Sequence, residues 1–73
     1  MINLKARYGA AIEAAIGKAK ATHQRETVSA SDGAEAHAYP HPRGIAWGVN
    51  DASGGFNLLR GVRRPDGIDE GVG

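Results

Sequence analysis

The stretch from Arg43 to Arg64, RGIAWGVNDASGGFNLLRGVRR, limits the possible folds more than any other part of the chain. It holds the only Trp and the only Phe of the sequence, and its turn-rich centre separates two apolar segments, 45–49 and 56–62. Short apolar segments bounded by Gly, Asn and Asp are typical of β-strands. We therefore predict a β-hairpin that supplies half of the core.

The register of this hairpin decides which side chains point inward. If Val49 faces Phe56, then Trp47 faces Leu58. Successive side chains of a strand point to opposite faces, so this register gathers the bulky side chains on one face. We expect that face to pack inside the protein, and we expect Leu59 to lie on the outer face, where a partner can reach it.

Residues 3–21 have the spacing of an amphipathic helix. Asn3 suits the N-cap, because its side-chain oxygen can accept a hydrogen bond from a free backbone N–H of the first turn. Apolar side chains recur along one stripe: Leu4, Tyr8, Ile12 and Ile16, with Ala11, Ala15 and Ala19 between them. We expect this stripe to pack against the hairpin.

A second face of the predicted helix carries only small residues: Ala6, Ala10, Ala14 and Gly17. Small residues let another helix approach closely, so this face is a candidate seam between two copies of the chain. Alanine is also a good helix former on a solvated face. The pattern is compatible with both uses.

Two further strands are predicted between the helix and the Arg43–Arg64 hairpin, at 26–31 and 34–39. The dipeptide Asp32-Gly33 between them is typical of a two-residue type I′ turn, which would pair Ser29 with Ala36. Pro40 and Pro42 make the following segment an extended connector.

The predicted fold is therefore α+β, with one N-terminal helix packed on a four-stranded antiparallel β-meander. It forms a single small domain over residues 1–64. Residues 65–73 are acidic and rich in glycine, and we expect them to be a flexible tail.

A chain of 73 residues has room for one small core, and alanine supplies much of its apolar content. Small domains of this kind gain stability from disulfides, a metal or oligomerisation. The sequence has no Cys, which excludes disulfides and thiol chemistry. We therefore expect a homodimer. No secretory signal and no membrane-spanning segment is recognisable, so we expect a cytoplasmic protein.

No residue pattern predicts catalysis, a metal site or a cofactor. His37 and His41 are four residues apart, but Pro40 and Pro42 exclude the helix that would place them on one face, so zinc ligation with His23 requires an unusual tertiary arrangement. Acid–base chemistry by Glu35 and His37 would need a substrate cleft, for which so short a chain has little volume. We predict a protein that is not an enzyme, with no metal and no cofactor.

The remaining function is binding. We predict a small protein–protein interaction protein that occupies a partner's surface, for example an inhibitor or a phage or mobile-element accessory protein. Its predicted partner-binding residues are Leu59, Arg60, Arg63 and Arg64 at the end of the hairpin, and Ala6, Ala10, Ala14 and Gly17 on the helix.

Nucleic-acid binding is the alternative function. Arginines beside aromatic side chains on a sheet are typical of proteins that bind single-stranded nucleic acid. The residues that would carry it are Arg43, Arg60, Arg63, Arg64 and Tyr39. A net charge of +1 gives this alternative little support.

Overall fold

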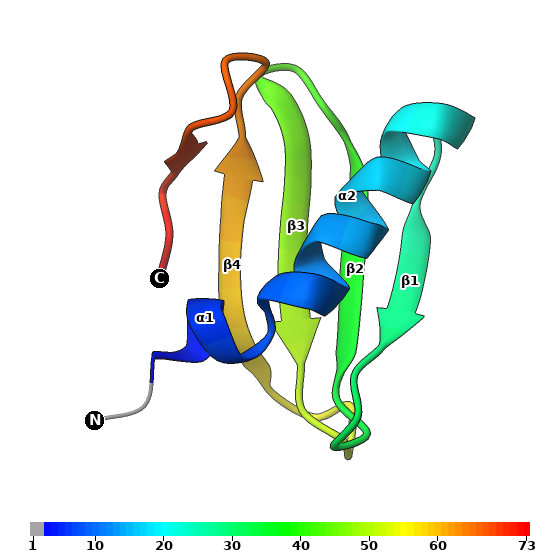
Figure 1. The fold of residues 1–73 in the computed structure, drawn as a ribbon, viewed down its shortest axis with the longest axis vertical. Helices are drawn as coiled ribbons and strands as arrows, with labels where there is room; N and C mark the ends of the chain where they lie inside the picture. The colour runs from blue at the N-terminus through cyan, green and yellow to red at the C-terminus, as the bar shows by residue number, and fades with distance from the viewer. Residues whose placement is uncertain (1–2) are drawn as a thin grey trace.

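The computed structural model describes residues 3–73 and shows an α+β fold with a five-stranded antiparallel meander (Figure 1). The strands follow one another across the sheet in chain order. The elements are α1 (Leu4–Arg7), α2 (Gly9–Thr22), β1 (Glu26–Ser29), β2 (Glu35–His41), β3 (Gly44–Asn50), β4 (Asn57–Arg63) and β5 (Asp69–Glu70). The predicted class, with its N-terminal helix and meander, is confirmed, and β5 is an additional strand.

Helix α2 crosses one side of the sheet, over β1, β2 and β3, and leaves the other side uncovered (Figure 1). We call these the helix side and the open side. No helix among residues 3–73 combines the length and the apolar composition needed to cross a membrane.

The predicted helical stripe forms the core on the helix side. Ile12, Ala15 and Ile16 are almost fully buried against Trp47 and Val49 of β3. Asn3 is the N-cap as predicted, and its Oδ1 accepts a hydrogen bond from the Ala6 amide at 3.2 Å.

The single helix predicted over 3–21 is divided at Tyr8. This residue leaves the helical conformation, with φ −102° and ψ 11°, and separates α1 from α2. Its hydroxyl donates a hydrogen bond to the Asp32 carboxylate at 2.5 Å. The break therefore coincides with an anchor between the helix and the β1–β2 loop.

The β1–β2 register differs by one residue from the predicted one. Val28 faces Ala36, because the loop has three residues instead of two and ends at Gly33 with φ 90°. The amide of Ala30 donates to the carbonyl of Ala34 at 2.7 Å and closes the loop. A shift of one residue exchanges the two faces of a strand. It places the alanines of β2 on the helix side and His37 and Tyr39 on the open side.

The β3–β4 register was also predicted wrongly, and the error moved Leu59 to the wrong face. Val49 faces Leu59 and not Phe56, and a bulge at Val49–Asn50 accompanies the change. Leu59 is consequently buried in the core at 7% exposure, whereas Phe56 lies in the loop at 71% exposure. The loop has the predicted six residues but begins one residue later, at 51–56, where the Asp51 carboxylate accepts hydrogen bonds from the amides of Gly55 and Phe56.

Residues 65–73, for which we predicted a flexible tail, lie along the outer edge of β4. Asp69 and Glu70 pair with Arg63 and Val62 as strand β5. Gly73 then exchanges two backbone hydrogen bonds with Arg60, at 3.0 and 3.1 Å. The segment supplies the fifth strand, and its mobility stays a prediction.

Candidate binding groove on the open side of the sheet

The open side of the sheet carries a groove of about 750 Å³ that follows β3. Strand β3 contributes Ala46 to the floor, since the side chains of Trp47 and Val49 point to the helix side and the imidazole of His37 covers Gly48. The neighbouring strands β2 and β4 carry larger side chains. The groove therefore has a floor of small residues between two walls, which stand about 10 Å apart at the usual strand spacing.

The wall on β2 is a row of rings: His37, Tyr39 and His41. The imidazole of His37 lies across Gly48, where a β-carbon would come within 2.7 Å of its Nε2. Burial lowers the pKa of His37 below its usual 6.5, and the positive charge of Arg25 lowers the pKa further. The Nδ1 atom of His37 is buried and has no hydrogen-bond partner among residues 3–73.

Tyr39 is the exposed ring of this wall, with 40% of its surface accessible. Its cross-strand neighbour is Ala46, which is too small to cover it. The guanidinium of Arg25 lies 5.9 Å from the centre of the Tyr39 ring, close enough for a cation–π contact. The row thus presents an aromatic surface with a positive charge beside it.

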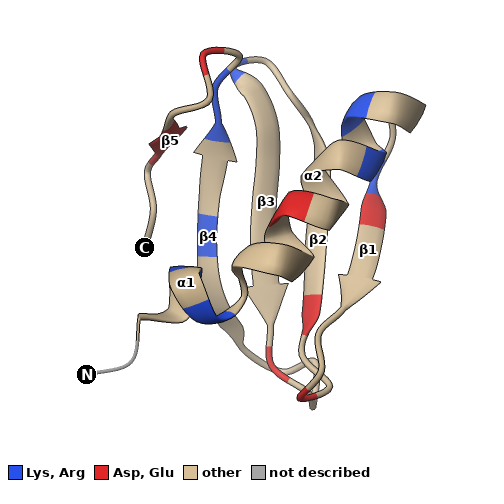
Figure 2. Cartoon of the chain, viewed as in Figure 1, with Lys and Arg blue, Asp and Glu red and all other residues tan. Residues whose placement is uncertain are grey.

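The opposite wall and the end of the groove carry two arginines. Arg60 faces Gly48 across the strand pair and is exposed, and within the described part of the chain it makes no ion pair. Arg43 stands at the end of the groove and is paired with Glu70 at 3.2 Å. Figure 2 shows that the basic residues are spread over α1, the end of α2 and β4, with no single basic face in that view.

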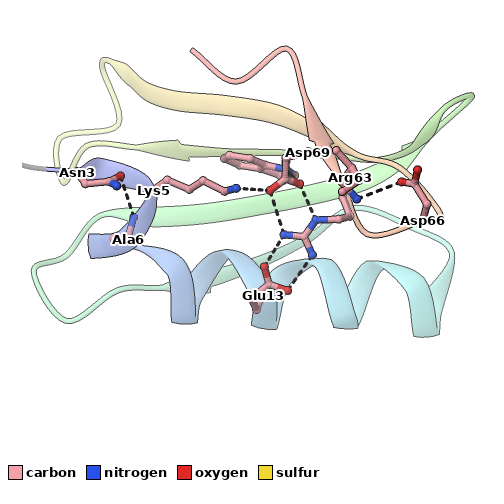
Figure 3. Close-up of polar contacts among 9 residues, drawn as sticks. Asn3, Lys5, Ala6, Glu13, Arg63, Asp66 and Asp69 are labelled. Carbon is pink, nitrogen blue, oxygen red and sulfur yellow. Dashed lines mark hydrogen bonds and ion pairs between the residues drawn. The ribbon is translucent and has the colours of Figure 1, made fainter.

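Arg63 and Arg64, which we predicted with Arg60 to bind a partner, are held by carboxylates of the protein itself (Figure 3). Arg63 points to the helix side and contacts both Glu13 and Asp69. These two carboxylates raise the pKa of Arg63 above its usual value. Arg64 pairs with Asp66 at 2.7 Å. Neither arginine offers an unopposed charge to a partner.

Asp69 is the centre of this network, with only 4% of its side chain exposed. It receives hydrogen bonds from Arg63 and from the indole N–H of Trp47, and Lys5 lies 2.8 Å away. Burial raises the pKa of Asp69, but the contacts with Arg63, Lys5 and Trp47 lower it more, to about 2. The network joins β5 to α1, α2 and β3, which is a structural role.

The predicted partner-binding residues do not form one surface. Leu59 is in the core, and Arg63 is bound on the helix side. The four small helix residues are exposed, one on α1 and three on α2: Ala6, Ala10, Ala14 and Gly17. In contrast, the structure brings together three residues of the alternative nucleic-acid set in one groove: Tyr39, Arg43 and Arg60.

The sequence contained a signal for this groove that our prediction missed. His37, Tyr39 and His41 alternate along one strand, and Ala46 and Gly48 alternate along the next. A row of rings beside a row of small residues predicts a trough once the register is known. We did not predict the β2–β3 register, on which this relation depends, and we predicted the β3–β4 register wrongly.

Within residues 3–73, no three His, Asp or Glu side chains converge as metal ligands would. Comparisons of the chain with protein-family models, with curated proteins and with solved structures found no match.

Proposed function

We propose that this chain is a small binding protein without catalytic activity, and that it holds a partner protein in the groove on the open side of its sheet. The observation that carries the proposal is the difference between the two sides of the sheet. The helix side is closed by α2, whereas the open side has an exposed Tyr39 and an Arg60 that makes no ion pair with residues 3–73, over a floor of small residues.

The composition of the groove supports a binding role. Aromatic side chains and arginines are enriched where proteins bind one another, because they combine a large contact area with directed hydrogen bonds. Tyr39 and Arg60 are such residues, and they lie on strands that hold their positions. An inhibitor or a phage accessory protein that occupies a partner's surface would act in this way.

A direct test compares capture by the wild-type protein and by a Tyr39→Ser, Arg60→Gln double variant. A lysate of the source organism is passed over each immobilised protein, and bound proteins are identified by mass spectrometry. The matched control is Lys18→Gln, which removes one positive charge from the exposed side of α2. A partner retained by the wild type and the control, but lost with the double variant, supports the groove. Equal capture by all three proteins contradicts it.

Single-stranded nucleic acid is the second candidate, because Tyr39, Arg43 and Arg60 line the same groove. Stacking of bases on Tyr39 with phosphates at the arginines would use these residues. Such binding should appear as a mobility shift at low salt and weaken steeply as salt rises. Absence of a shift at low salt removes this candidate. Trp47 takes no part in such stacking, because it is buried at 2% exposure.

We further propose that the protein works as a homodimer in the cytoplasm. The core contains few large side chains, since the large buried residues of the described chain are Trp47, Ile12, Ile16, Val49, Tyr8 and Leu59 and the others are alanines. A second copy would add buried apolar area to this small core. The mass of the protein in solution tests the dimer.

A further inference from the structure

The groove already contains one carboxylate, which comes from the protein itself. Glu70 of β5 lines the groove, and its Oε1 accepts a hydrogen bond from Arg43 at 3.2 Å. Arg64 lies 3.9 Å from the other carboxylate oxygen. The side chain of Glu70 is 30% exposed, so this carboxylate lies at the surface of the groove, within reach of a competitor.

The strand that carries Glu70 resembles a bound peptide in its geometry. Asp69 and Glu70 pair with Arg63 and Val62, the chain then bends at Gly71, where φ is 63°, and Gly73 exchanges two backbone hydrogen bonds with Arg60. Addition of an extended segment to a sheet is one of the recurrent ways in which proteins bind peptides. The fold thus seats one carboxylate of a short edge strand, that of Glu70, at the end of the groove.

Arg60 offers a second position for a carboxylate, and no Asp or Glu side chain of residues 3–73 occupies it. Arg60 and His37 are the two cross-strand neighbours of Gly48, and the imidazole of His37 lies on Gly48 between them. Among the described residues no carboxylate pairs with Arg60, in contrast to Arg43, Arg63 and Arg64. On the β2 wall, the rings of His37 and Tyr39 offer an apolar surface to a partner side chain that lies in the groove.

From these contacts we infer that the groove binds an acidic, aromatic-containing segment of a partner protein, and that Glu70 is a built-in competitor for the carboxylate position at Arg43. One carboxylate of the partner lies on Arg60, and a second displaces Glu70 from Arg43. An aromatic side chain of the partner packs against Tyr39. The inference rests on the proposed function and adds the chemistry of the partner and a contact that limits its affinity.

The probe is a short synthetic peptide of alternating Glu and Tyr, and its binding is measured by fluorescence anisotropy at low salt. Glu70→Gln should tighten binding about two- to fivefold, the range expected for one exposed ion pair. The matched control is Glu26→Gln, which changes the net charge equally but lies near Thr22, away from the groove. Arg60→Gln should weaken binding, whereas Lys18→Gln should not. Circular dichroism of each variant checks that it is folded.

The outcomes separate the inference from the proposed function. If Glu70→Gln and Glu26→Gln tighten binding equally while Arg60→Gln weakens it, the groove is used but Glu70 is not a competitor. If no protein binds the peptide, or if Arg60→Gln binds like the wild type, the acidic-segment groove is wrong as well. A single-stranded oligothymidine that binds where the peptide does not would overturn the peptide chemistry and favour nucleic acid.

Discussion

Gly44 occupies a position at the start of β3 that no other residue fits. Its φ is 144°, and a β-carbon built there would lie 2.0 Å from the carbonyl oxygen of Arg63. Both the backbone strain and the overlap with a neighbouring strand oppose a side chain. We predict that Gly44→Ala lowers the free energy of unfolding by about 3 kcal/mol, measured by urea denaturation. A loss well below this would mean that β3 and β4 can separate at this end.

Gly17 is the opposite case, because it lies inside α2 and a β-carbon added there would meet no neighbour within 4 Å. Glycine in an exposed helix costs about 1 kcal/mol relative to alanine. We predict that Gly17→Ala raises the free energy of unfolding by about 0.5–1 kcal/mol, measured in the same urea series. A decrease would indicate that this position contacts a second copy of the chain, as the small-residue seam requires.

At the scale of elements, the helix and the strands could be predicted from local patterns, whereas their registers could not. The spacing of Leu4, Ile12 and Ile16 depends only on the helical period, and it gave the buried face correctly. Register depends on loop geometry, which Asp32 and Asp51 determine through hydrogen bonds to nearby backbone amides. The sequence showed turn residues at both places but not which residues form each turn.

The groove was less predictable than the fold for the same reason. Its arrangement depends on His37, Gly48 and Arg60 lying in one row, which requires the β2–β3 and the β3–β4 registers. Asp69 was placed in a flexible tail because a short acidic segment has no apolar pattern of its own. Its position depends on contacts with Lys5 and Arg63, of which Lys5 is far away in the sequence.

Strand β5 is held by an ionised carboxylate, which makes the protein sensitive to acid. The pKa of Asp69 is about 2 in the folded state, below the usual 3.8. The unfolded chain therefore binds this proton first as the pH falls. The stabilisation by Asp69 is complete well above pH 3.8 and is lost as the pH falls from 3.8 towards 2.

We predict that Asp69→Asn lowers the free energy of unfolding at neutral pH by about 3 kcal/mol. The uncharged Asn side chain cannot form the buried ion pair with Arg63. Between the folded-state pKa of about 2 and the usual pKa of 3.8, the stability of the variant should change less with pH than the stability of the wild type. Urea denaturation across this pH range measures both. Asp66→Asn is the control, since Asp66 is an exposed partner of Arg64 and should have a much smaller effect. An unchanged pH profile in Asp69→Asn would contradict the network.

For the whole molecule, the two edges of the sheet differ. The outer edge of β4 is covered by β5 and Gly73, whereas no segment of residues 3–73 pairs with the outer edge of β1. Because the Ala30 amide bonds inward to β2, the alternation of an antiparallel pair turns the amides of Thr27 and Ser29 outward. A second copy could pair with these groups, with Val28 opposite Val28 at the twofold axis.

We therefore predict a homodimer formed through β1, with a mass in light scattering of about twice 7.6 kDa. Thr27→Pro removes one outward amide without removing a bond to β2, so it should give a monomer, while Thr27→Val should remain a dimer. A wild-type monomer at high concentration would contradict the dimer itself. A dimer that survives Thr27→Pro but is lost in Ala14→Lys would place the interface on the small-residue face of α2 and leave the edge of β1 free for another partner.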